Sequence, residues 1–208
     1  MKWTKVFLNE FYAKSAAQFL RYACYVIMVI LFLSLVLSCI GRQTFILHSH
    51  TGTYERAIFA EEDHAPNSRG LTVSVKDDIH VWTDENDEID ILTQIGIFLM
   101  FALNTIPLIF GYCLLSRVFS NVQQGKIFTE DNAPYLLGYG LIQVFVAFFV
   151  PFIKLFLCWL TSLVSGSRLS IATGQDTLNT LIPSIAFLVA AYIIHYGIHL
   201  QDEVDHTL

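Results

Sequence analysis

Charged residues are scarce in this 208-residue chain, at 14% of the sequence, whereas an average soluble domain carries roughly 25%. Hydrophobic residues make up 54%. Most of them are gathered into four runs of about 20 residues, the length that crosses a hydrocarbon core of roughly 30 Å. The shortage of charge excludes an ordinary soluble domain and predicts a membrane protein with four transmembrane helices.

Basic residues are fewer than acidic ones, and the cysteines are confined to the apolar runs and their ends. The chain has 12 Lys and Arg residues against 18 Asp and Glu residues, a net charge of −6, so we expect no basic face for direct binding to nucleic acid. Cys24, Cys39, Cys113 and Cys158 all lie within or at the ends of apolar runs, and the polar segment 41–90 has none. We therefore expect no disulfide framework.

Familiar catalytic motifs are missing as well. The sequence contains no Walker loop, no nucleophile elbow and no HExxH element, which are the patterns that phosphate chemistry, acyl transfer and zinc-dependent hydrolysis use. We therefore predict a protein that is not an enzyme and has no cofactor.

A set of three histidines and one aspartate lies near the C-terminal end of the chain. His195, His199, Asp202 and His206 recur at the spacing of a single helix face, and such a set could hold a metal or act as a pH switch. A single helix offers at most about two adjacent ligands before strain sets in, and no further partner can be named from the sequence. We favour the structural interpretation, in which these histidines bond to neighbouring helices or water, and predict no metal site.

The order of the apolar runs predicts an all-α membrane protein, a four-transmembrane-helix bundle with a small β-containing extracytoplasmic loop. The basic N-terminus, with Lys2, Lys5, Lys14 and Arg21 against the single acid Glu10, places both termini in the cytoplasm by the positive-inside rule. The predicted segments are an amphipathic cytoplasmic segment at 1–21, spans at 22–40, 91–115, 135–160 and 180–200, an extracytoplasmic loop at 41–90, a cytoplasmic loop at 116–134, an outer loop at 161–179 and a cytoplasmic tail at 201–208.

The loop at 41–90 reverses the charge balance of the N-terminus. It has 4 basic residues against 11 acidic ones, which is typical of a segment outside the cell. Alternation in 71–75 and again in 79–82 predicts a short β-hairpin with one apolar face. Because a lone hairpin is only marginally stable, we expect it to pack on another surface, such as the segment 53–60 or a second copy of the chain.

Residues 123–132 form a polar interruption between the second and third apolar runs, which we call the 123–132 loop. Gly125 can supply a tight turn, Thr129 has the chemistry of a helix N-cap, and Glu130 and Asp131 place negative charge where a helix N-terminus favours it. Phe128 is positioned to pack back on the first turn of the following helix. The loop therefore predicts a turn that leads directly into the third span.

Within the third span, three residues carry specific expectations. Gly138 and Gly140 predict close contact between helices. Lys154 lies near the far end of this span, and we expect its side chain to snorkel to the outer headgroups beside Trp159. The alternative is a lysine on an ion pathway.

Two stretches, 124–132 and 200–208, resemble the bacterial four-span membrane family catalogued as domain of unknown function 2975. In that family G-K-x-F-[ST]-x-x-N precedes the third helix and L-x-x-E-[NV]-D-x-T-[IVL] follows the fourth. The matching residues are Gly125, Lys126, Phe128, Thr129 and Asn132 in the first stretch, and Leu200, Glu203, Asp205 and Thr207 in the second. His206 stands where an apolar residue is commoner. The resemblance implies the membrane half of a two-gene unit whose other half is a small helix-turn-helix protein.

The leading hypothesis is a non-enzymatic regulator or sensor in a bacterial cell membrane that binds a cytoplasmic partner such as a helix-turn-helix transcription factor. The candidate partner-binding residues are Gly125, Lys126, Phe128, Asn132, Asp202, Glu203, Asp205 and Thr207. An acidic tail suits a basic partner, although the same tail could instead pair with Lys126 and Arg117 as a structural lock. A self-protection protein against membrane-acting peptides, and a small transporter or its accessory subunit, remain as alternatives. The lipid bilayer is the other partner, and a homo-oligomer stays open.

Overall fold

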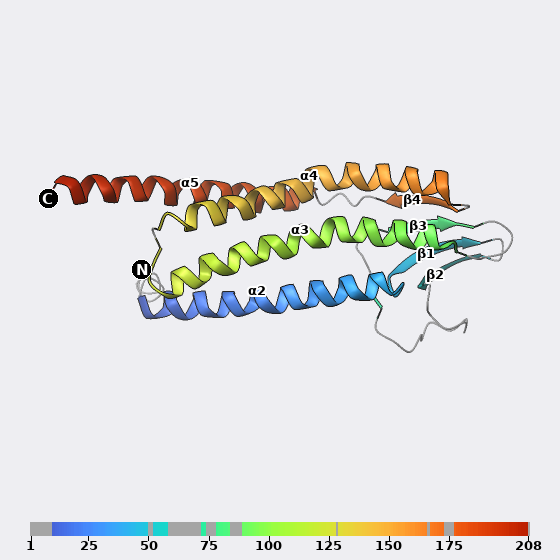
Figure 1. Cartoon of the computed structure of the whole chain (residues 1–208), viewed down its shortest axis with the longest axis horizontal. Coiled ribbons are helices and arrows are strands. Elements are labelled where there is room, and N and C mark those ends of the chain that lie inside the picture. Colours follow the sequence, from blue (N-terminus) through green and yellow to red (C-terminus); the bar gives the residue numbers. More distant parts are fainter. Residues whose placement is uncertain are drawn as a thin grey trace. The chain divides into compact units, whose positions relative to one another are not determined.

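Four long helices and four short strands make up the described part of the chain (Figure 1). The computed structural model describes residues 10–49, 52–57, 72–73, 78–83, 89–127, 129–165, 167–172 and 177–207. The helices are α2 (Glu10–Cys39), α3 (Ile91–Gln123), α4 (Asn132–Val164) and α5 (Thr177–Thr207), and the strands are β1 (Thr44–Ser49), β2 (Gly52–Ala57), β3 (Asp78–Trp82) and β4 (Arg168–Ala172). Each helix contains a stretch long and apolar enough to cross a membrane. The four predicted apolar spans are therefore confirmed as helices, and the fold is that expected of a multi-pass membrane protein.

The helices extend well beyond the predicted spans. Helices α3 and α4 have 33 residues each, or about 50 Å at a rise of 1.5 Å per residue, whereas the hydrocarbon core measures roughly 30 Å. The predicted loop 116–134 is consequently helical up to Gln123, and the predicted tail 201–208 belongs to α5 as far as Thr207. The predicted span limits fall where polar residues begin, but polar residues alone do not end a helix.

The chain divides into two compact units. The loop unit comprises Met1–Ile30, Pro107–Ala147 and Leu178–Leu208, and the sheet unit comprises Leu31–Ile106 and Phe148–Thr177.

The sheet unit contains a four-stranded sheet with the strand order β2-β1-β3-β4. β1 pairs antiparallel with β2 and parallel with β3, and β3 pairs antiparallel with β4. The small β element is thus present, but the predicted hairpin between 71–75 and 79–82 is wrong, because β3 pairs with strands from two other segments. Of 71–75 only 72–73 is described, and Val73 makes one isolated bridge to Gln43.

One face of the sheet packs on the helices of the same unit, as the position of the strands beside α3 and α4 in Figure 1 illustrates. Alternate strand residues point to this face, and Leu47 and Val81 are fully buried in it. The cluster consists of Phe45, Leu47, Ile79, Val81 and Leu169 from the sheet with Ile97, Met100 and Cys158 from α3 and α4. Burial of such side chains contributes about 1.5–3 kcal/mol each, so this cluster fixes the sheet on the helix ends.

The opposite face of the sheet carries a layer of stacked rings. The ring of His48 lies 4.6 Å from that of Trp82 with an interplanar angle of 10°, and His48 Nδ1 lies 3.0 Å from Thr53 Oγ1. Trp82 keeps 38% of its surface exposed. Three neighbouring strands therefore place polar and aromatic groups together on the face that the helices leave uncovered.

Close helix packing occurs at three glycines. A Cβ atom added to Gly138 would lie 2.9 Å from Leu114 Cδ1, and one added to Gly140 would lie 2.8 Å from Leu188 Cδ2, both within the loop unit. In the sheet unit, one added to Gly96 would lie 2.5 Å from Thr161 Oγ1. The close contacts predicted at Gly138 and Gly140 are confirmed.

Lys154 does not lie where the sequence predicted. Its side chain is 6% exposed and belongs to the same buried face of α4 as Val150 and Cys158, one helical turn to either side. Trp159 is exposed instead. The prediction of a snorkelling lysine is wrong because it used the depth of Lys154 along the helix and not the direction in which its side chain points.

Candidate functional site

The 123–132 loop begins with a tight reversal at the end of α3. Lys126 N donates to Asn121 O at 2.9 Å, Gly125 N donates to Val122 O at 3.0 Å, and Gly125 has a φ of 80°. This pair of hydrogen bonds around a left-handed glycine is the Schellman ending of a helix. The turn predicted at Gly125 is confirmed, because only glycine adopts this conformation without a steric cost.

Asn132, the first residue of α4, holds the loop from inside. Its side chain is fully buried. It accepts a hydrogen bond from Asn121 Nδ2 at 2.7 Å and donates to the carbonyl oxygens of Lys126 and Ile127, each at 2.8 Å. We call these four residues the Asn132 clasp. A buried amide without partners would cost about 1–3 kcal/mol, so the clasp strongly favours this loop conformation.

The helix start differs from the predicted cap. The first helical bond of α4 runs from Tyr135 N to Asp131 O at 3.3 Å, which makes Asp131 the N-cap position, and Asn132 N donates to the main-chain oxygen of Thr129. Thr129 Oγ1 is buried and has no hydrogen-bond partner in the described part of the chain. The N-cap prediction for Thr129 is therefore wrong, because α4 begins at Asn132 and Thr129 lies two residues before the N-cap position.

The structure separates the predicted partner-binding residues into different roles. Gly125 and Lys126 are exposed, and the side chain of Ile127, whose carbonyl belongs to the clasp, is 44% exposed. Asn132 is buried, so it can support a binding surface but cannot touch a partner directly. Phe128 lies outside the described residues.

The structure describes only the backbone of the predicted tail residues. Asp202, Glu203, Asp205 and Thr207 lie in the last turns of α5, and their side chains are outside the described set. The prediction that they join the loop in one surface stays a prediction. The structural role predicted for His195 and His199 also stays a prediction, because of these two side chains only that of His195 is described.

Helix α2 also lies beside the 123–132 loop, which joins α3 to α4. Lys14 Cε would lie 3.7 Å from a Cβ added to Gly125, and Arg21 Nη1 donates to Gln123 Oε1 at 3.4 Å. Side chains of α2, α3 and α4 thus meet at the loop end of this unit.

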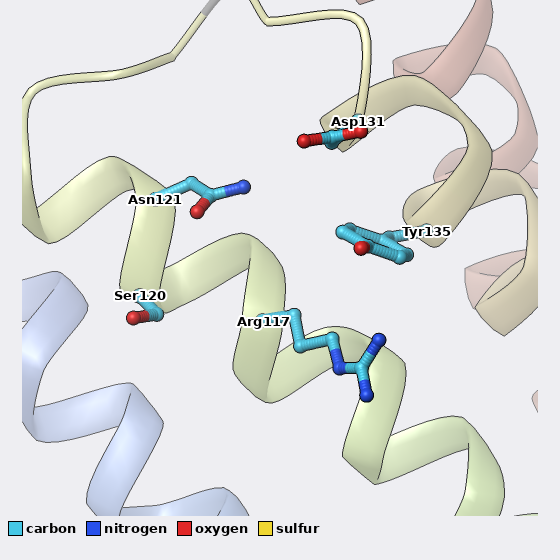
Figure 2. Close-up of a pocket in the computed structure, with 5 residues that line it drawn as sticks. All are labelled: Arg117, Ser120, Asn121, Asp131 and Tyr135. Atoms are coloured by element: carbon cyan, nitrogen blue, oxygen red, sulfur yellow. The ribbon is translucent and has the colours of Figure 1, made fainter.

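A polar pocket of about 280 Å³ opens beside the clasp. Figure 2 shows its lining residues, with Asp131 and the Arg117 guanidinium on opposite sides of the Tyr135 ring. The guanidinium carbon lies 5.6 Å from the centre of that ring. The lining residues are Arg117, Ser120 and Asn121 of α3, Asp131 before α4, and Tyr135 of α4.

The spacing of polar residues at the end of α3 could have predicted this pocket, but the predicted span ends at residue 115. Arg117, Ser120 and Asn121 are spaced i, i+3 and i+4, which places them on one face only if α3 continues past residue 115. The pocket joins one cation and one anion with neutral polar groups. Within the ranges that the structure describes, no three His, Cys, Asp or Glu side chains lie close enough to hold a metal.

Comparison with family models, with curated proteins and with solved structures gives no match. The resemblance to the four-span family therefore rests on the matching residues alone.

Proposed function

We propose that this chain is a non-enzymatic regulator or sensor of a bacterial cell membrane that binds a cytoplasmic partner through the 123–132 loop and the end of α5. One observation supports the proposal most directly. The Asn132 clasp uses a fully buried side chain to hold the carbonyl groups of Lys126 and Ile127, while their side chains remain exposed.

This arrangement favours recognition because the loop is ordered before a partner arrives. Ordering a flexible loop during binding costs affinity, and a loop already fixed by internal hydrogen bonds avoids much of that cost. Lys126 offers a charge and Ile127 an apolar contact, so the exposed surface combines the two kinds of group that a specific interface needs.

The chemistry of the partner follows from the end of α5. Asp202, Glu203 and Asp205 concentrate negative charge there, which complements a basic surface. A DNA-binding regulator has such a surface by necessity. If the acidic residues occupy it, capture at the membrane competes with DNA binding, and events in the membrane helices can shift that equilibrium.

Deletion of residues 201–208 tests the proposal. We expect the shortened protein to insert stably and to lose co-purification with its cytoplasmic partner. Unchanged co-purification would contradict the proposal, and loss of the protein itself would favour the structural lock with Lys126 and Arg117. Glu130→Gln is the matched control, since it removes one exposed acid outside the tail and should leave co-purification intact.

A second candidate function has one observation in its favour. Lys154 is buried on α4, and an ionisable group buried among membrane helices is a common mark of a substrate or ion path. A small transporter or its accessory subunit therefore remains as the competing proposal. Lys154→Met removes the charge at similar size, so a transporter should lose flux while partner binding at the 123–132 loop should persist.

A further inference from the structure

The polar pocket is lined by one cationic and one anionic side chain, and this pair restricts the class of ligand that can bind there. Arg117 and Asp131 both line it, yet the guanidinium lies over the ring of Tyr135, and no ion pair joins the two charges in the described part of the chain. A simple anion would satisfy Arg117 but meet the carboxylate of Asp131, and a simple cation would meet the guanidinium. A ligand that carries both charges satisfies both residues.

We propose that this pocket binds the phosphoethanolamine headgroup of a membrane lipid, with the phosphate at Arg117 and the ammonium at Asp131. Arginine binds phosphate through a planar fork of donors. A primary ammonium carries three donors, for which the Asp131 carboxylate is a suitable partner. This inference does not rest on the proposed cytoplasmic partner.

The order of residues along α3 matches the order of groups in a lipid. Phe110 and Arg117 are seven residues apart, which places them on one helix face, and Phe110 is among the most exposed apolar side chains of α3. Asn121 follows one turn after Arg117, and Asp131 lies in the loop beyond the helix end. From the membrane outwards the surface therefore changes from apolar to cationic to anionic, as a phosphatidylethanolamine molecule changes from acyl chain to phosphate to ammonium.

The size and chemistry of the pocket exclude several competitors. Its volume of about 280 Å³ lies just below the roughly 300–1,000 Å³ of pockets for drug-sized ligands, so it suits a small headgroup. Phosphatidylglycerol and inorganic phosphate provide no cation for Asp131. Phosphatidylcholine has a quaternary ammonium without an N–H group, so it cannot donate a hydrogen bond to the carboxylate.

The first test measures lipid retention by native mass spectrometry on the purified full chain. The protein is offered equal amounts of phosphatidylethanolamine, phosphatidylcholine and phosphatidylglycerol with identical acyl chains. We expect preferential retention of phosphatidylethanolamine. Arg117→Gln and Asp131→Asn should each weaken it about tenfold, the loss expected for one charge-assisted contact.

Matched variants control for charge alone. Arg168→Gln removes an exposed cation of β4, and Glu130→Gln removes the acid next to Asp131, and both should retain the lipid as the unchanged protein does. Equal retention of the three lipids, or a loss in Glu130→Gln as large as that in Asp131→Asn, would overturn the proposal. Circular dichroism and size-exclusion chromatography establish that each variant is folded, and the two pocket variants decide the question independently.

A charge exchange distinguishes a lipid from a free zwitterion. In the double variant Arg117→Asp, Asp131→Arg the pocket keeps both charges but reverses their order. Soluble phosphoethanolamine can turn round and should still bind, whereas a lipid anchored by its acyl chains cannot and should be lost. Retention of phosphatidylethanolamine by the exchanged pocket would contradict the proposed orientation and with it the lipid assignment.

Discussion

His48 Nε2 lies 2.8 Å from His80 Nδ1, so a single hydrogen bond joins the two imidazoles across β1 and β3. The residues are diagonal neighbours, because His80 is opposite Ile46 and His48 is opposite Trp82 in the parallel register. One ring must donate and the other must accept, while Trp82 covers His48 by stacking. The exposed face of the sheet is therefore held by specific contacts and not only by the apolar cluster beneath it.

Replacement of Trp82 by alanine should loosen this face. The variant loses the stacked pair with His48, worth about 0.5–1.5 kcal/mol beyond the area buried, and hydrogen exchange of the β1 and β3 amides should become faster. The control is Arg168→Ala, which changes the residue paired with Trp82 on β4 without removing a ring. Unchanged exchange in Trp82→Ala would show that the stack contributes nothing to the sheet.

Loss of the Asn132 clasp should open the loop between α3 and α4. Asn132→Asp keeps the shape and the acceptor for Asn121 but cannot donate to the two carbonyl groups, and it adds a buried negative charge. We expect a loss of at least about 2 kcal/mol in local stability, as for two buried hydrogen bonds. Faster hydrogen exchange confined to residues 124–131 is the measurement. Protection equal to that of the unchanged protein would refute the clasp.

The contact between α3 and α4 in the sheet unit should respond to one added methyl group. Gly96→Ala places a Cβ 2.5 Å from Thr161 Oγ1, and overpacking of this kind costs about 1–3 kcal/mol. Thr161→Ala removes the obstructing atoms, so the double variant should recover much of the loss. Thermal unfolding in detergent gives the coupling between the two sites, and strictly additive effects would show that they do not meet.

The predicted topology places the sheet and the 123–132 loop on opposite sides of the membrane. Cysteines at Thr53 of β2 and at Gln124 of the loop, both exposed, test this in a chain whose four native cysteines have been replaced. An impermeant maleimide added to intact cells should label Thr53→Cys and should label Gln124→Cys only after lysis. The reverse pattern would invert the orientation and remove the argument for a cytoplasmic partner.

The sequence predicts the helices well because a membrane span depends on one local property, a run of apolar residues. The glycine contacts follow for a similar reason, since small residues in such runs mark close helix approach. The sheet could not be predicted in detail because its pairing is not local. Its central strand β3 takes its neighbours from segments that immediately follow α2 and α4, and the apolar residues of β1 resemble a continuation of the span before it.

The candidate site shows the same limit on a smaller scale. The sequence singles out Asn132, but it does not show whether the Asn132 amide faces a partner or the inside of the 123–132 loop. The clasp depends on Asn121, which the predicted end of the second span at residue 115 left outside any helix. The prediction for Lys154 is wrong for a related reason. Hydropathy indicates how far along the membrane span a residue lies, but it does not indicate on which face of the helix its side chain points.

The strand order also has a consequence for biosynthesis. β4 follows α4, so the edge of β3 has no partner until residue 172 has been made, and an open strand edge is a site of aggregation. This residue is made only after the third apolar segment, because β4 follows α4 in the chain. The β4 segment can then pair with β3 only if α4 is inserted with its C-terminal end on the same side of the membrane as β1 to β3. A chain in which α4 is inserted the other way round would leave the edge of β3 without its β4 partner.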